Sequence, residues 1–487
     1  MASLAGGLTR AASRPRRLAA LLALVVFACS PAPSGEPLAT TSGSPILPTA
    51  TPTPTPRGSS AATPLLTLEP TPGTAIVAGA VDRSSLDVSA TYDVDLDVTV
   101  GTGAIAVEAV IEARNDSGSP IDRLALNTIA ARLGGLKVTS ATVDGQAVTV
   151  TIDDQTLLVP LGGILPDGAS TTVRLGYAAT LRPDLDGSNW LFSRAGGTLA
   201  LYRWIPWVSR AVPFDRPNHG DPFVTPSSPR VTATVTTDVP MILASPAALP
   251  VADGRTWSFV ARDVRDVALV LAPDFVVATG DANDIAVRAF TRPGGLDGDR
   301  LVAQAVNALD EMADRLAVAY PWPAFTIVET NGGYGMESPG LIWIPSGTLA
   351  ANIPYLVHHE AAHQWYYGLV GNDQQAEPFA DEAAADFLAR TVLGGLRGSR
   401  CDRAPLDRGI TGYSQDCYYE VIYIQGGNLL DDLREAMGPD RFWTALRDYL
   451  EASRFGMAGT RQLLDALQAA SPGDLLPNLR ARFPSLY

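Results

Sequence analysis

The sequence predicts a multidomain β plus α/β protein, in which an antiparallel β domain precedes a domain with a mixed sheet lobe and a helical lobe. Apolar and polar residues alternate over 92–98 and 171–181, which is the period of half-buried strands. Over 297–320 and 379–393, apolar residues recur every three to four positions, as in an amphipathic helix. The first period gives way to the second near residue 283, which places the domain boundary there.

Turn signals place the elements within each domain. An NDSG cluster at 115–118 and a DG pair at 144–145 separate early strands, and a Gly-Gly pair at 394–395 ends a later helix. The β domain is expected over 80–282, with strands at 92–98, 105–113, 148–152 and 171–181. The second domain is expected over 283–487, with strands at 285–291, 325–328 and 341–344, helices at 297–320, 353–370 and 379–393, and further helices to its end.

The first 29 residues have the pattern of an export signal. Four arginines precede an apolar run at 18–28 that is too short to span a bilayer as a stable anchor. The run ends at Cys29 in a segment that resembles the lipobox of bacterial lipoproteins, whose lipidated cysteine anchors the protein to a membrane. An ordinary signal peptide with an incidental cysteine is the alternative. Residues 30–79 are rich in Pro and Thr, so we expect a disordered tether and an extracellular or periplasmic, membrane-anchored protein.

Charge and cysteine content narrow the partners and the compartment. Because the formal net charge is −15, nucleic acid is not an expected partner. If Cys29 is acylated, Cys401 and Cys417 remain as an even pair outside the cytosol. A disulfide between these two is then expected, and two unpaired thiols are the alternative.

The sequence His-Glu-x-x-His at 359–363 is the strongest chemical signal in the chain. Its spacing puts His359 and His363 on one face of a helix, where both imidazoles can reach one metal ion, and Glu360 lies beside them. Glu382, from a second helix, completes three ligands and leaves a fourth position open, which is the ligand set of a catalytic zinc. The chain has only four histidines, so chance is a poor explanation; a surface helix with stray histidines is the alternative.

Four segments together resemble the aminopeptidase N family of gluzincin metallopeptidases. They are HEAAHQW at 359–365, Asp-Glu at 381–382, GMES at 335–338, close to the family's Gly-x-Met-Glu-Asn element, and YIQG at 423–426, close to its Tyr-x-Lys-Gly element. Their order also matches the family. The resemblance implies a thermolysin-like catalytic domain, one Zn²⁺ ion and peptide substrates. Because 64 residues follow Tyr423, the large C-terminal helical domain of full-length members is expected to be absent and the cleft open.

The resemblance assigns a role to each matched residue. It implies that His359, His363 and Glu382 bind the zinc. It implies that Glu360 is the general base, which takes a proton from the attacking water and later gives it to the leaving amine. It also implies that the hydroxyl of Tyr423 stabilises the oxyanion of the tetrahedral intermediate; a packed tyrosine at a helix start is the alternative.

Three further residues have candidate roles beside this set. The family's glutamate that matches Glu337 holds the free α-amino group of the substrate, which makes the enzyme an aminopeptidase; a solvated acid at a strand end is the alternative. Asp386, one helical turn after Glu382, is a candidate hydrogen-bond acceptor for a ligand imidazole, or else a solvated helix acid. Tyr418 is a candidate for a supporting role near Tyr423.

The sequence departs from the family at two positions, with Ser338 in place of Asn and Gln425 in place of Lys. Both departures leave the catalytic set intact and bear on the exopeptidase assignment. An aminopeptidase that trims extracellular peptides is therefore the leading interpretation. A zinc endopeptidase of the same fold and a non-catalytic peptide-binding lipoprotein are the alternatives.

Overall fold

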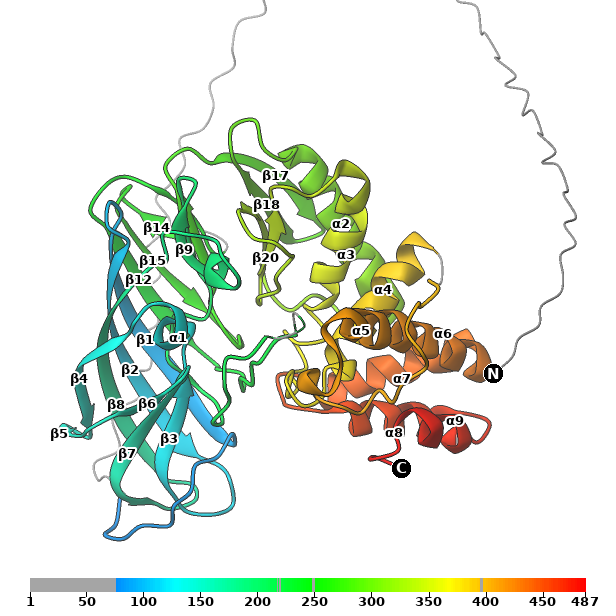
Figure 1. Cartoon of the computed structure of the whole chain (residues 1–487), viewed down its shortest axis with the longest axis horizontal. Helices are drawn as coiled ribbons and strands as arrows, with labels where there is room; N and C mark the ends of the chain where they lie inside the picture. The colour runs from blue at the N-terminus through cyan, green and yellow to red at the C-terminus, as the bar shows by residue number, and fades with distance from the viewer. Residues whose placement is uncertain (1–75, 217, 219, 248–249, 395–396) are drawn as a thin grey trace, which may run out of the picture. The chain divides into compact units, whose positions relative to one another are not determined.

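The computed structural model describes residues 76–487 apart from 217, 219, 248–249 and 395–396. The predicted signal peptide, Cys29 and nearly all of the predicted tether lie outside the described residues. The described residues belong to one compact unit of the chain, in which a β-rich half and a helical half can be distinguished (Figure 1). Within these residues, no helix has both the length and the apolar character needed to cross a bilayer.

Three sheets build the β-rich half (Figure 1). The largest runs in the order β14 (Val251–Ala252), β15 (Thr256–Ala261), β12 (Val231–Thr237), β1 (Val88–Thr99), β2 (Ala104–Asn115), β8 (Ser170–Thr180), β4 (Lys137–Val143) and β5 (Gln146–Ala147). The second runs β11 (Trp207–Val208), β3 (Ile121–Asn127), β7 (Thr156–Leu165), β6 (Thr151–Asp153), and the third runs β13 (Ile242–Ala244), β16 (Leu269–Ala272), β10 (Thr198–Leu201), β9 (Phe192–Ala195). Two short helices, α1 (Ile129–Leu133) and η1 (Asn189–Leu191), complete this half.

Alternation along the strands sets which face is buried, as the sequence predicts. In β1, every second side chain is buried, because successive side chains of a strand point to opposite faces. The expectation of a purely antiparallel domain is wrong at one pair, since β1 runs parallel to β12 with Tyr92 opposite Val231. The long chain between these two strands builds other sheets before it returns, which is the kind of connection that parallel pairing needs. The strand expected at 148–152 is also wrong, because β5 ends at Ala147 and β6 begins at Thr151.

A fourth sheet has the predicted mixed character. It runs β17 (Val276–Ala282), β18 (Ile285–Thr291), β19 (Ala324–Thr330), β20 (Leu341–Pro345), with β17 antiparallel to β18 and the other pairs parallel. The crossover from β18 to β19 is the helix α2 (Gly298–Leu316). Asp297 caps its N-terminus, because its carboxylate accepts a hydrogen bond from the Arg300 N–H at 3.1 Å. The helix ends before the expected residue 320, because Ala317 is left-handed with φ 50°. Because β17 ends at Ala282 and belongs to this sheet, the second domain begins before the domain boundary that the sequence predicts at residue 283.

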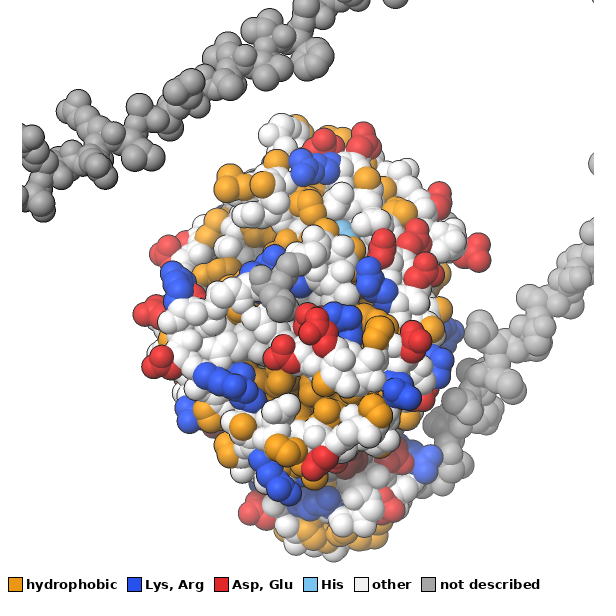
Figure 2. Space-filling view, turned by 90° about the vertical axis from the view of Figure 1, so that its right-hand side faces the viewer, with side chains coloured by type: hydrophobic (Ala, Val, Ile, Leu, Met, Phe, Trp, Pro, Cys, Tyr) orange, Lys and Arg blue, Asp and Glu red, His pale blue; other side chains and the backbone are white. Residues whose placement is uncertain are grey.

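Helices make up the rest of the chain (Figure 1). They are η2 (Ala350–Asn352), α3 (Ile353–Ala362), η3 (Phe379–Ala383), α4 (Ala384–Leu393), η4 (Ile410–Gly412), α5 (Gln415–Tyr419), η5 (Glu420–Gln425), α6 (Gly426–Met437), α7 (Pro439–Ala452), α8 (Thr460–Ala470) and α9 (Leu476–Arg482). Acidic and basic side chains are interspersed over the face that Figure 2 shows. The helix expected at 353–370 is shorter than predicted, because the N–H of Gln364 bonds the carbonyl of Ala361 in a tighter turn and Tyr367 has φ 115°.

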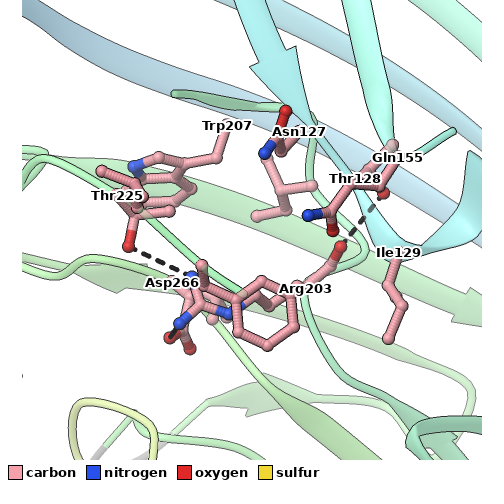
Figure 3. Close-up of a pocket in the computed structure, with 12 residues that line it drawn as sticks. Asn127, Thr128, Ile129, Gln155, Arg203, Trp207, Thr225 and Asp266 are labelled. Carbon is pink, nitrogen blue, oxygen red and sulfur yellow. Dashed lines mark hydrogen bonds and ion pairs between the residues drawn. The ribbon is translucent and has the colours of Figure 1, made fainter. Parts of the chain in front are cut away.

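Arg203 and Asp266 form a buried ion pair beside a small cavity (Figure 3). The guanidinium of Arg203 lies 3.8 Å from Asp266 and donates to Thr225 Oγ1 at 3.1 Å and to the Tyr367 hydroxyl at 2.9 Å. The adjoining cavity has a volume of about 10 Å³, which is room for a single water molecule at most. This cavity therefore does not hold a substrate, and its polar side chains tie the β-rich half to the segment that follows α3.

Candidate metal centre and substrate cleft

The structure brings the three predicted ligands together. His359 lies in the last turn of α3 and His363 caps the same helix, so their Nε2 atoms are 3.3 Å apart. Glu382 lies in η3, and its Oε2 is 3.3 Å from His359 Nε2 and 3.4 Å from His363 Nε2. A tetrahedral ion with bonds of ~2.0–2.1 Å holds its ligand atoms about 3.3 Å apart. The three atoms thus have the spacing of one face of a zinc site.

An unpartnered oxygen gives a second indication of a cation at this position. Glu382 Oε2 is buried and accepts no hydrogen bond from the described residues. A buried carboxylate oxygen without a partner costs free energy, which a divalent cation removes. Burial raises the pKa of Glu382, but the imidazoles of His359 and His363 lie so close that they hold it well below its usual range. The residues present therefore fit Zn²⁺.

Two π-helical segments carry residues that the sequence assigned to the site. Glu382 lies in η3, and Tyr423 lies in η5. Such segments insert one residue into a helical turn and are frequent at functional sites. The ring of Tyr423 stacks on that of His359 with centroids 5.5 Å apart, and the ring of Tyr418 packs against Tyr423 at 5.9 Å. Both tyrosines line the same cleft as the three ligands.

Glu360 is buried beside the ligands, with 4% of its surface exposed. Burial raises its pKa well above the usual range, and the negative charges of Glu337 and Glu382 raise it further. A carboxylate in this environment is a strong proton acceptor. The backbone at Gly335 passes so close to the Glu360 carboxylate that a Cβ there would force the carboxylate to shift.

The GMES segment places Glu337 in the cleft. Met336 pairs with Trp343 of β20 through an antiparallel bridge, in which the Trp343 N–H donates to the Met336 carbonyl at 2.9 Å. Glu337 is 97% buried rather than solvated, and burial raises its pKa to about 7. Its Oε1 accepts from Gln374 Nε2 at 2.9 Å, and Gln374 Oε1 accepts in turn from Arg203 at 3.3 Å. A side chain of the β-rich half thus takes part in positioning Glu337.

The expected role of Asp386 is wrong. Its Oδ1 accepts from the Tyr355 hydroxyl at 2.6 Å and from Arg397, and among the described residues it makes no hydrogen bond to a ligand imidazole. The imidazole of His363 instead bonds through Nδ1 to the Tyr366 carbonyl at 3.1 Å, and Asp381 Oδ1 lies 3.2 Å from the same nitrogen as an ion-pair partner. The physical reason is the π-helical turn, which directs adjacent side chains toward the imidazoles, whereas Asp386 lies one turn further along α4.

Sequence reasoning missed a loop of the β-rich half that lines the cleft. Asp221, between β11 and β12, pairs with Arg216 at 2.8 Å, and both residues line the cleft. Burial raises the pKa of Asp221 to about 7. The cleft has a volume of about 760 Å³, enough for several residues of a peptide. In the sequence, this loop is rich in Pro, Gly and Asp, which is the composition of an ordinary turn, so no local signal marks it as part of a site.

A disulfide closes the loop next to η5. Cys401 and Cys417 are bonded, with their Cα atoms 5.8 Å apart. Gln425, which stands where the family has Lys, donates to the carbonyls of Cys401 and Asp402 at 3.0 Å each. The side chain of Glu420 accepts from the Cys401 N–H at 3.3 Å. The departure at Gln425 therefore has a structural role in this loop.

Comparison with known proteins finds related sequences and solved structures with a similar fold. Aminopeptidase M1 from Arabidopsis thaliana is 20% identical over 439 residues, covering 80% of this chain and 47% of that protein. The alanine/arginine aminopeptidase of Saccharomyces cerevisiae is 26% identical over 230 residues, 39% of this chain and 26% of that protein. A mutant M1 zinc metallopeptidase from Deinococcus radiodurans superposes with a TM-score of 0.63 at 18% identity, over 81% of this chain and 94% of that one.

The chain has the fold of the M1 zinc metallopeptidases. The resemblance to the aminopeptidase N family, predicted from the four motifs, is confirmed. The predicted fold class, a β domain followed by a mixed and helical domain, is confirmed as well. The chain spans about half the length of the Arabidopsis relative, and no family model matches it.

Proposed function

We propose that this M1-like protein is a zinc-dependent aminopeptidase that removes N-terminal residues from peptides. The observation that carries the proposal is the position of Glu337, which has a carboxylate oxygen within 4.8 Å of ligand atoms of Glu360 and His363. An ammonium paired with Glu337 places the first peptide bond over the metal centre. Burial makes this charge pairing stronger than it is in bulk water.

The side chains of the chain supply the proton transfers and the positioning. A Zn²⁺ ion held by His359, His363 and Glu382 supplies Lewis acidity for the scissile carbonyl and lowers the pKa of water. Glu360 accepts the proton of the attacking water and passes it to the leaving amine. The hydroxyl of Tyr423 donates to the carbonyl oxygen as negative charge develops there, which is worth about 3–4 kcal/mol for one donor of this kind.

Two named relatives support peptides as the substrate class. The Arabidopsis protein is named an aminopeptidase, and one structure of the Deinococcus enzyme is described with a Tyr-Ser-Ala substrate bound.

We further propose export and membrane anchoring through a lipid on Cys29. The sequence of the first 29 residues supports this, and so does the Cys401–Cys417 disulfide, because disulfides persist in oxidising compartments. Membrane fractionation of wild type and Cys29→Ala tests the anchor, and wild-type protein in the soluble fraction contradicts it.

Three substrates test the activity. These are alanyl-aminocoumarin, its N-acetylated form, and an internally quenched decapeptide with an acetylated N-terminus, each with zinc and with chelator. We expect chelator-sensitive hydrolysis of the first alone. Glu337→Gln is expected to lower kcat/KM on the first by at least about tenfold, since a charged pair with the ammonium is lost. If the acetylated decapeptide is cleaved in preference to alanyl-aminocoumarin, the proposal is contradicted and the protein is an endopeptidase. Zinc-free protein without any hydrolysis indicates a binding protein.

A further inference from the structure

Two guanidinium groups next to the cleft share a single carboxylate. Asp386 Oδ1 bonds the guanidinium of Arg397 and the hydroxyl of Tyr355, and Arg390 Nε lies 3.9 Å from the same oxygen. Among the described residues, Asp386 is the one carboxylate within 4.0 Å of either guanidinium. One carboxylate therefore faces two cations, and a positive charge remains uncompensated.

Arg390 presents this charge to the cleft. Together with Tyr355 and Tyr419, it lines the cleft wall. Its Cζ lies 4.0 Å from the centroid of the Tyr355 ring, a stacking that fixes the plane of the guanidinium. Its Nε is buried and donates no hydrogen bond to the described residues, while a quarter of the side chain stays exposed. The guanidinium is thus held in position and has an N–H group without an acceptor among the described residues.

The direction of the cleft relates Arg390 to the scissile bond. Glu337 lies next to His363, whereas the Tyr355 ring lies 5.7 Å from the ring of His359, on the way to Arg390. A substrate with its N-terminus at Glu337 therefore extends past His359 toward Arg390. Arg390 is two helical turns beyond Glu382, about 12 Å at 1.5 Å per residue. Because the arginine side chain itself spans part of that distance, an extended peptide reaches the guanidinium within about two residues of the scissile bond.

We propose that Arg390 forms a subsite for a substrate carboxylate, two residues beyond the scissile bond on the leaving-group side. This inference rests on the proposed aminopeptidase function and names its substrate class. A guanidinium with free donors pairs with a carboxylate through two parallel hydrogen bonds. At this distance, the carboxylate is either the C-terminus of a tripeptide or the side chain of an acidic third residue in a longer peptide.

Paired substrates separate these two sources. The first pair is Ala-Ala-Ala and its C-terminal amide. The second pair is the pentapeptide amides Ala-Ala-Glu-Ala-Ala-NH₂ and Ala-Ala-Gln-Ala-Ala-NH₂. For each pair, the ratio of kcat/KM is measured on wild type, Arg390→Gln, Arg390→Lys and the control Arg447→Gln. The control removes an arginine from the surface of α7, where it pairs with Asp448. Alanyl-aminocoumarin, which has no residue beyond the scissile bond, reports the proposed function separately.

In wild type, we expect the carboxylate member of at least one pair to be preferred by about tenfold, which corresponds to about 1.4 kcal/mol. Arg390→Gln is expected to abolish this preference, Arg390→Lys to retain part of it, and Arg447→Gln to retain all of it. Preference in the first pair alone identifies the C-terminus as the ligand, and preference in the second identifies an acidic side chain. The subsite is overturned if the wild-type protein shows no preference for the carboxylate member of either pair. It is also overturned if Arg390→Gln keeps the wild-type preference. If alanyl-aminocoumarin and all four peptides are left intact, the proposed function itself fails.

Discussion

Gln374 joins the β-rich half to the substrate cleft, and its replacement tests whether that link positions Glu337. Its amide donates to Glu337 Oε1 at 2.9 Å and accepts from Arg203 at 3.3 Å. Gln374→Met keeps nearly the same volume and removes both hydrogen bonds. We therefore expect a Glu337 carboxylate whose orientation is less fixed, in a metal centre that is otherwise unchanged.

The size of the effect follows from the charge of the acceptor. A hydrogen bond to a charged group contributes about 1.5–3 kcal/mol, which is roughly 10- to 150-fold in an equilibrium constant. Because the bound ammonium of the substrate restores one partner to Glu337, we expect the lower end of this range. KM for alanyl-aminocoumarin should thus rise about tenfold while kcat changes by less than about threefold.

The assay needs a control for lost stability. Asn372 is as buried as Gln374, and its amide donates to the Glu377 carbonyl at 2.9 Å, away from the cleft. Asn372→Leu should therefore lower the melting temperature to a similar extent and leave KM unchanged. Initial rates, zinc content and thermal unfolding are measured for both variants. Equal KM values for the two variants, or a fall in kcat at constant KM for Gln374→Met, would refute the positioning role.

Four other outcomes can be checked on the same protein. Glu360→Gln should lower kcat by about 10²–10⁴-fold at full zinc content, and substantial remaining activity rules out its role as base. Tyr423→Phe should lower kcat by about 10²–10³-fold with little change in KM, and a change confined to KM speaks against an oxyanion donor. The free energy of unfolding of the zinc-free protein should fall as the pH rises from about 5 to about 8. Buried carboxyls with raised pKa values, such as Asp221, bind more protons in the folded than in the unfolded state, and this advantage is lost as they ionise. A melting temperature of the zinc-free protein that stays constant or rises over this range contradicts this. Reduction of the Cys401–Cys417 disulfide, with its sequence separation of 16, should lower the free energy of unfolding by about 3 kcal/mol, and an unchanged melting temperature would argue against that cross-link.

Local patterns were sufficient for most of the elements. The expected strand at 285–291 coincides with β18, and the expected helix at 379–393 coincides with η3 and α4 together. The errors occur where partners distant in sequence decide the structure. The parallel pairing of β1 with β12 depends on the path of more than a hundred intervening residues, and the early end of α3 depends on how the following turn packs.

The ligand set was determined by the sequence itself, because an i, i+4 pair of histidines on one helix leaves little freedom in how they point. Glu382 needed only a second helix at a suitable place, and the motif spacing predicted that helix. The surroundings of the ligands were decided by tertiary structure alone. Asp221 lines the cleft, and Arg203 acts on Glu337 through Gln374; these residues come from separate segments of the chain, and no periodicity relates them. The exchange of Asp386 for Asp381 beside His363 has a similar origin, since a π-helical turn is fixed by packing and not by local preference.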